Sequence, residues 1–320
     1  MKSSVMIVPP GGGHKLWFLG QMAIHLARGD QTDDMYTVGC GETPAGQGPP
    51  PHVHSREDEA FYVLSGEFEF RAGNGTVTCG PDSFVTIRPG TAHTFRCIGS
   101  NPGHLIVFCA PAGFDRFQSE AGDPYVNGQP MPQFDLAAAI ARLMSVAPKY
   151  GIDLNPPAEA FTVAPQMRVS GPTDGPAFAV GGDRYRILAT GDDTGGRFAA
   201  LEIAVWPGGG SPLHRHAFVS EGFYVLDGDV EFMFGTNRIQ LSAGAFYHVP
   251  AGRVQRYRNV GQTVARLLAF AVPAGIERFI ADVGTPMALA DAVPPAPTAG
   301  ELERLVARAP LCGLEISPAP

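Results

Sequence analysis

The sequence predicts an all-β protein built from two similar antiparallel barrels or sandwiches, each closed by a flanking α-helix. Two observations carry this prediction. The 320-residue chain repeats itself at an offset of 162 residues, and short runs rich in Phe, Val, Ile and Tyr recur between turn-forming residues. The 40 glycines and 30 prolines supply those turns, because neither residue suits the interior of a helix.

The internal repeat covers most of the chain without a net gap. HLARGDQTDD (25–34) aligns with ILATGDDTGG (187–196), FYVLSG (61–66) with FYVLDG (223–228), FCAPAGFDRF (108–117) with FAVPAGIERF (270–279), and APKYGIDLNP (147–156) with APLCGLEISP (309–318). We therefore expect two homologous domains, residues 1–162 and 163–320, each of ordinary domain size. The shared register turns every difference between the halves into an internal comparison.

The elements of each half follow one order. In the first half the expected strands include AFYVL, FEFRA, SFVTI, TFRCI and LIVFCA. Each half then ends in a helical pattern, FDLAAAIARLMSV (134–146) and AGELERLVAR (299–308), whose leucines and isoleucines recur at helical spacing. Such amphipathic helices are expected to pack on the outside of a barrel.

Composition excludes several classes of function. A net charge of -8 without any basic run argues against nucleic acid or an anionic membrane as partner. No apolar stretch is long enough to span a bilayer, and the N-terminus lacks the apolar core of a signal peptide. The five cysteines are scattered and odd in number, so we expect buried, reduced thiols in a cytoplasmic protein. A monomer and a homodimer both remain open, because the edge strands of the two halves can pair within or between chains.

One stretch, GPPPHVHSREDEAFYVLSG (48–66), has the residues of a metal site. His52 and His54 are two apart, so on a strand they point to the same face. Glu59 lies an odd number of residues away and is expected on the next strand, after a turn made by SRED (55–58). His93, in RPGTAHTF, follows a Pro-Gly turn and is the fourth candidate ligand.

Three imidazoles and one carboxylate suit a first-row divalent ion such as Fe, Mn, Co, Ni, Cu or Zn. Such an ion keeps one or two positions open for substrate and for dioxygen or water, as a catalytic metal does. Glu59 can serve as a ligand or as a general base, depending on how tightly it is held.

The second half repeats this layout incompletely. His214, His216 and Glu221 correspond to the first three residues, but Gln255 stands where His93 would be. An amide is a weak ligand for transition metals, so we expect one metal per chain, held in the first half. The second set either binds a metal more weakly or forms a hydrogen-bonded polar cluster.

The remaining histidines fit less clearly. His248 lies near Gln255 in sequence and is a candidate replacement for the missing ligand. For the isolated His14, His25 and His104 we expect surface or hydrogen-bonded roles.

These spacings resemble the cupin family. The first cupin motif, G(x5)HxH(x4)E(x6)G, is matched at Gly46, His52, His54, Glu59 and Gly66, and again at Gly208, His214, His216, Glu221 and Gly228. The second, G(x5)PxG(x2)H(x3)N, is imperfect twice: Asp82, Arg88 and Cys97 depart from it in the first half, and Gln255 does in the second. The resemblance implies two tandem cupin barrels, also described as double-stranded β-helices or jelly rolls, with a few flanking α-helices.

Among two-barrel cupins the chain is similar to quercetin 2,3-dioxygenases, which open the central ring of a flavonol with dioxygen and release carbon monoxide. The resemblance implies a metal held by His52, His54 and His93, and a substrate hydroxyl that passes its proton to Glu59. The partners would be a small phenolic substrate and dioxygen. Six phenylalanines are candidates to line the cavity or to fill the core: Phe61, Phe68, Phe70, Phe84, Phe95 and Phe108.

Two other functions remain open. One is a metal-dependent cupin cyclase, isomerase or hydrolase that acts on an aromatic or polyketide-like metabolite. The other is a cupin that binds or senses a ligand without turnover.

Overall fold

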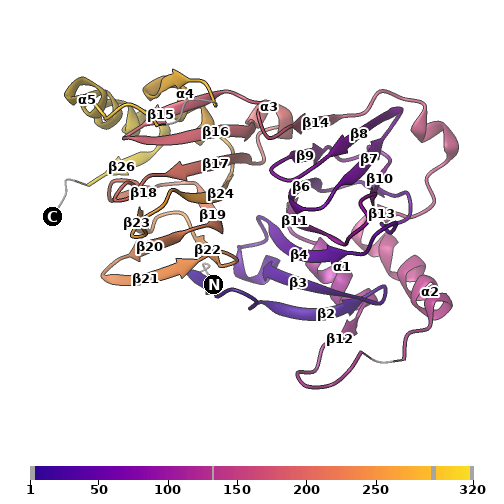
Figure 1. Ribbon diagram of the computed structural model, residues 1–320. Helices are drawn as coiled ribbons and strands as arrows, with labels where there is room; N and C mark the ends of the chain where they lie inside the picture. Colours follow the sequence, from indigo (N-terminus) through magenta and orange to yellow (C-terminus); the bar gives the residue numbers. More distant parts are fainter. Residues whose placement is uncertain (1–3, 132, 290–292, 318–320) are drawn as a thin grey trace. The chain divides into compact units, whose positions relative to one another are not determined.

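The computed structural model describes residues 4–131, 133–289 and 293–317. They form two compact units (Figure 1). One unit, which we call the N-terminal barrel, consists of residues 13–172, and the other, the C-terminal barrel, joins the first twelve residues to the chain from Thr173 onward. The predicted all-β class with two similar barrels is confirmed.

The N-terminal barrel is built from an eight-stranded sheet, a three-stranded sheet and a strand pair, all antiparallel. In sheet order the eight strands are β12 (Asp123–Pro124), β2 (His14–Phe18), β3 (Gln21–Ala27), β4 (Thr37–Thr43), β11 (Gly103–Ala110), β6 (Asp58–Ser65), β9 (Phe84–Ile87) and β14 (Met167–Ser170). The three-stranded sheet has the order β10 (His93–Cys97), β7 (Phe68–Ala72), β8 (Gly75–Cys79), and the pair is β13 (Ile152–Asp153) with β5 (Val53–His54). Apolar side chains of β6, β7, β9 and β10 meet between the two larger sheets and form the barrel core.

The C-terminal barrel repeats this plan. Its eight-stranded sheet has the order β1 (Met6–Val8), β22 (Phe246–Val249), β19 (Ser220–Asp227), β24 (Ala265–Val272), β17 (Ala199–Val205), β16 (Asp183–Ala189), β15 (Ala177–Val180), β25 (Thr285–Met287). Its five-stranded sheet has the order β21 (Asn237–Ser242), β20 (Asp229–Phe234), β23 (Val254–Asn259), β18 (His214–His216), β26 (Leu314–Ile316). Gly66 and Gly228 make the equivalent turns after β6 and β19, and both have a positive φ that a residue with a side chain rarely adopts.

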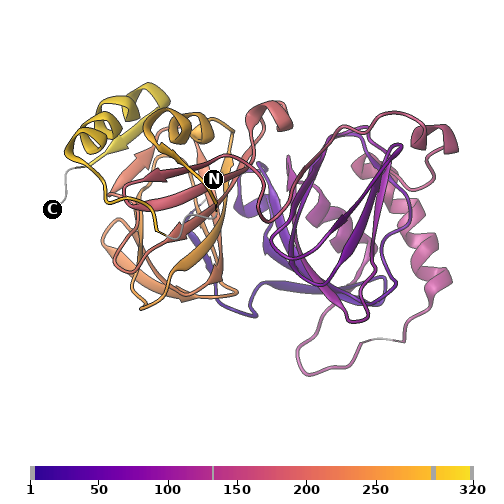
Figure 2. The same cartoon turned by 45° about the horizontal axis from the view of Figure 1, so that its top comes forward.

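Both predicted helices are present, as α2 (Leu136–Val146) and α5 (Ala299–Arg308). Asp135 and Thr298 start them, because each side chain accepts hydrogen bonds from the free N–H groups of the first turn. In Figure 2, α4 and α5 lie together on one side of the C-terminal barrel. Among the described residues, seven further helices were not placed by the sequence: α1 (Phe114–Ala121), α3 (Gly191–Thr194), α4 (Ile276–Val283), and the 3-10 helices η1 (Gly29–Gln31), η2 (Ala147–Tyr150), η3 (Ala158–Phe161) and η4 (Ala309–Cys312).

The compact units differ from the sequence halves by one strand each. β1 pairs with β22, although β1 belongs to the first half of the chain, and β14 pairs with β9, although β14 belongs to the second. The two pairings are equivalent in register. Met6 pairs with His248 and Arg168 pairs with Thr86, and Arg168 and His248 stand 162 residues after Met6 and Thr86. The duplication therefore includes a reciprocal exchange of one strand.

The cysteines are only partly as expected. Cys79, Cys97 and Cys109 are buried, whereas Cys40 is half-buried and Cys312 is exposed; all five are free thiols. The expectation of burial is therefore wrong for Cys312, which lies at the end of η4 on the surface. Among the described residues, no helix has the length and apolar character needed to cross a membrane.

Candidate metal centre

Three neighbouring segments of the N-terminal barrel bring the four predicted ligands together. His54 ends β5, Glu59 lies on β6 beyond the SRED turn, and His93 opens β10. His52 precedes β5 and pairs with His93 through two backbone hydrogen bonds of 2.9 and 2.8 Å. The strand ends therefore hold all four residues in one place, as the alternation of side chains predicted.

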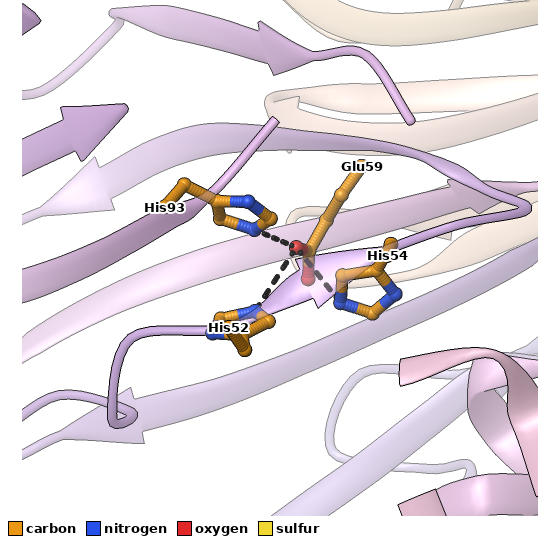
Figure 3. Close-up of side chains that lie close together, drawn as sticks. All are labelled: His52, His54, Glu59 and His93. Carbon is orange, nitrogen blue, oxygen red and sulfur yellow. Dashed lines mark hydrogen bonds and ion pairs between the residues drawn. The ribbon is translucent and has the colours of Figure 1, made fainter. Parts of the chain in front are cut away.

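The side chains converge on one point (Figure 3). Oε2 of Glu59 lies 2.9 Å from Nε2 of His93, 3.4 Å from Nε2 of His54 and 3.8 Å from Nε2 of His52. The four ligand atoms all lie within 4.8 Å of one another. All four residues are at least nine-tenths buried, so the cluster is shielded from bulk water.

Burial and mutual charge shift the pKa values of this cluster. Burial, helped by the neighbouring His93, lowers the pKa of His52 to about 4. Burial alone would raise the pKa of the Glu59 carboxyl, but the charge on His54 and the close imidazoles of His52 and His93 hold it well below its ordinary value. A neutral His52 and an ionised Glu59 are the states that a metal requires. Burial alone would lower the pKa of His54, but the neighbouring carboxylates Glu59 and Glu57 raise it, so a metal that binds there displaces its proton.

The far nitrogen of each imidazole has its own partner. Nδ1 of His52 lies 2.9 Å from the carbonyl of Pro50, and Nδ1 of His93 lies 2.8 Å from that of Thr91. These contacts favour the tautomer that leaves Nε2 free for a metal.

His54 has a charged partner instead. Its Nδ1 lies 3.4 Å from Oε2 of Glu57, a carboxylate that is only 2% exposed. A carboxylate behind a metal-binding imidazole orients the ring and increases its basicity. The sequence predicts only a turn at Glu57. The signal for its further role is the difference between the halves, since the equivalent residue beside the incomplete cluster is Val219, which has no carboxylate.

This donor set fits a divalent transition metal. Nε2 of His54 is buried and, apart from the 3.4 Å ion-pair contact with Glu59, has no hydrogen-bond partner among the described residues, an arrangement that a bound ion would complete. Three imidazole nitrogens and a carboxylate are also the ligand types that first-row metals accept.

The cluster opens on a cavity of about 710 Å³ in the N-terminal barrel, whose wall includes His52, His54 and Glu59. Most of the remaining wall is apolar and comes from β3, β4, β11, α1 and α2. On α2, Leu136, Ile140 and Met144 are 56%, 46% and 47% exposed, and all three line this cavity. The predicted amphipathic helix thus turns part of its apolar face to the cavity.

Two of the six candidate phenylalanines, Phe61 and Phe95, line the cavity. Phe68 and Phe70 are fully buried in the barrel core beside them. Phe84 and Phe108 are also fully buried and are not among the cavity residues.

In the C-terminal barrel, His214, His216 and Glu221 form a second buried cluster. Nε2 of His216 and of His214 lie 3.3 and 3.9 Å from Oε2 of Glu221, close to the distances in the first cluster. Gln255 takes the position of the fourth ligand and donates a short hydrogen bond from Nε2 to that same oxygen. Its own Oε1 is buried without a hydrogen-bond partner among the described residues.

His248 is not part of this cluster, which corrects one candidate. On β22, Tyr247 and Val249 point into the barrel core, so His248 between them points to the opposite face of the sheet. The isolated histidines have the surface or hydrogen-bonded roles that were expected: His14 and His104 are exposed, and His25 is buried and hydrogen-bonded.

Comparison with known proteins agrees with this geometry. A family model described as "Cupin domain" matches residues 41–109 and residues 201–271. The quercetin 2,3-dioxygenase of Bacillus subtilis (strain 168) is 27% identical over 289 residues, which cover 86% of this chain and 85% of that protein.

Two solved structures share the fold. Oxalate decarboxylase of Lactobacillus farciminis, in complex with formate, superposes with a TM-score of 0.59 at 13% identity, over 90% of each chain. Procruciferin, an 11S globulin of Brassica napus, gives a TM-score of 0.60 at 13% identity, over 91% of this chain and 87% of its own. At these identities the likeness concerns the fold alone. With a cupin domain matched in each half and the first cupin motif complete in both, the chain is a bicupin that resembles quercetin 2,3-dioxygenase.

Proposed function

We propose that the chain is a metal-dependent dioxygenase that cleaves the ring of a flavonol or a similar enolisable phenolic, with one divalent metal held in the N-terminal barrel. The observation that supports this most is the position of the histidine cluster in the wall of a large, mostly apolar cavity. A flat aromatic ligand fits such a wall, and a relative of nearly the same length is a quercetin 2,3-dioxygenase.

His52, His54, His93 and Glu59 would hold the metal. When bound, it would supply Lewis acidity that acidifies a substrate hydroxyl. Glu59 lies at the cavity wall, so its carboxylate, when it is released from the metal, is placed to accept the proton of that hydroxyl. In the overall reaction two carbon–carbon bonds of the ring break, both atoms of dioxygen enter the product, and one ring carbon leaves as carbon monoxide.

The rest of the chain would exclude water from the reacting ring. Phe114 packs against His54, with ring centroids 5.6 Å apart, and it lines the cavity with Phe61 and Phe95. An apolar wall beside the ligands keeps the deprotonated ring away from bulk solvent.

Oxygen uptake tests the proposal. Protein loaded in turn with Fe, Mn, Co, Ni, Cu or Zn is mixed with quercetin, and we expect equal amounts of dioxygen and flavonol to disappear while carbon monoxide forms. Turnover of a phenolic without oxygen uptake would instead indicate a cyclase, isomerase or hydrolase. Binding without any turnover would indicate a binding or sensing protein, and either result would overturn the dioxygenase.

The free thiols support a reducing compartment, and we propose the cytoplasm.

A further inference from the structure

A buried polar pair lies in the otherwise apolar part of the cavity wall. His25, on β3, is 2% exposed, and its Nε2 lies 2.8 Å from Oε1 of Gln118 on α1. Gln118 is half-buried and lines the cavity that begins at the metal cluster. Neither residue is used by the metal site or by the chemistry proposed above.

The pair leaves the amide nitrogen of Gln118 available. Burial lowers the pKa of His25, so its imidazole is neutral, and its Nε2–H donates to Oε1 of Gln118. The amide is thereby fixed with its oxygen toward β3, while its Nε2 makes no hydrogen bond within the described part of the chain. Two N–H donors are free to meet an oxygen atom in the cavity.

The barrel fold does not require this pair. In the C-terminal barrel the equivalent positions are Ile187 and Ile280, which are both 4% exposed and belong to one apolar core cluster. In that barrel two isoleucines therefore connect β16 and α4, which are equivalent to β3 and α1. His25 also stacks on His14, but that contact does not explain a buried polar pair at a cavity wall where the other barrel has two isoleucines, so the pair calls for a reason other than stability.

The location of Gln118 points to a ligand that also reaches the metal. Phe114, one helical turn before Gln118 on α1, has its ring centroid 5.6 Å from that of His54. Four residues of α-helix advance by about 6 Å, so Gln118 lies about that much farther along the helix than the ring beside the ligand. A flat multi-ring molecule anchored at the metal cluster and packed along Phe114 would bring an oxygen substituent near Gln118.

We propose that Gln118 is a specificity-determining residue: its amide donates a hydrogen bond to a hydroxyl oxygen on the part of the phenolic substrate remote from the metal. His25 is the positioning residue that sets the orientation of this amide. The inference rests on the proposed function, in that it takes the cavity to hold a phenolic ligand.

Binding under nitrogen tests it without turnover. Metal-loaded wild type is titrated by calorimetry with quercetin and with analogues that each lack one hydroxyl group. We expect one analogue to bind about tenfold more weakly than quercetin, the loss of a single hydrogen bond. Gln118→Ile, which copies Ile280, should lose about tenfold for quercetin and should no longer distinguish that one analogue, while its preference at every other hydroxyl is unchanged.

His25→Ile should give the same pattern, and the double variant should lose no more than either single one, because the two residues act as a unit. Gln118→Met, of similar shape but without donors, separates hydrogen bonding from packing and should behave as Gln118→Ile does. An equal loss for all analogues would mean that Gln118 only shapes the wall, and an unchanged pattern would mean that it does not contact the ligand. Either result overturns the inference.

The dioxygenase activity and the role of Gln118 are tested by different measurements. Oxygen uptake by the wild type tests the dioxygenase, whereas selective binding under nitrogen tests Gln118. Selective binding without oxygen uptake would keep the inference and reject the dioxygenase. Failure of every phenolic to bind would reject both.

Discussion

The two barrels share strands, turns and helices at a constant offset, yet they treat the barrel interior differently. In the N-terminal barrel, β4 presents Gly39 and Gly41 to the cavity, whereas β17 has Leu201 and Ile203 at the same positions, both in the core. Ala23 of the cavity wall corresponds to Tyr185, whose hydroxyl lies 2.5 Å from that of Tyr257. The same framework thus encloses a cavity in one copy and packs large side chains in the other.

The metal clusters differ in the same direction. His93 corresponds to Gln255, and Glu57 behind His54 corresponds to Val219. At both positions the second cluster lacks the group that favours metal binding: an amide replaces an imidazole ligand, and an apolar side chain replaces the carboxylate behind His54. The comparison teaches that the strand ends set where ligands can gather, while a few side chains decide whether that place binds a metal and opens to a substrate.

The largest effect is expected when the N-terminal barrel receives the C-terminal barrel's residue at the fourth ligand position. His93→Gln removes one of the four proposed ligands, and we expect bound metal and oxygen uptake to fall by more than roughly 100-fold, a larger effect than loss of an outer partner. Elemental analysis and an oxygen electrode measure the two quantities. His104→Gln, at a half-exposed histidine, is the matched control and should change neither; a His93→Gln protein that stays active would reject the site assignment.

The reverse exchange tests the second cluster. Gln255→His adds an imidazole to His214, His216 and Glu221, which already converge, and removes the amide that is hydrogen-bonded to Glu221. We expect metal content to rise by one ion per chain relative to wild type. If wild-type protein already contains two ions per chain, the amide does not prevent binding and the proposal of one metal per chain is wrong.

A smaller effect is expected at Glu57. Glu57→Val, which copies Val219, removes the charged partner of His54 Nδ1, and metal affinity should fall by about 10–100-fold. Glu57→Gln should lose less, because its amide oxygen still accepts a hydrogen bond. Competition with a chelator measures the affinity, and Glu69→Gln, at an exposed carboxylate of β7, serves as the control. Equal affinities of wild type and Glu57→Val would show that the carboxylate is only part of the packing.

Much of this asymmetry could be predicted from the sequence because the two halves share one register. The common direction of His52 and His54, the placement of Glu59 on the next strand and the absence of an imidazole at Gln255 all follow from the sequence and from side-chain alternation. Helices α2 and α5 follow from their apolar periodicity, while the structure adds the capping residues Asp135 and Thr298.

Other features depend on contacts that spacing does not encode. The exchange of β1 and β14 requires knowing which sheet edge each strand joins, and three or four residues carry no such information. The pair of His25 and Gln118 depends on how α1 packs on β3, and α1 itself was not predicted. Glu57 reads as a turn residue until the fold places its carboxylate behind His54.

The smallest effect is expected at the cavity wall, where β4 has a glycine and β17 an isoleucine. Gly41→Ile copies Ile203, and a Cβ at Gly41 would lie no closer than 3.5 Å to the nearest atom, the carbonyl oxygen of Met22, so the strand tolerates a side chain there. The added side chain fills part of the cavity, and we expect phenolic ligands to bind roughly tenfold more weakly while metal content is unchanged. Calorimetric titration and elemental analysis separate the two effects, and Gly41→Ala should give an intermediate loss. Unchanged ligand binding in Gly41→Ile would place the substrate elsewhere. Loss of metal would mean that a side chain on β4 disturbs the histidine cluster, so that the cavity wall and the metal site do not vary independently between the two barrels.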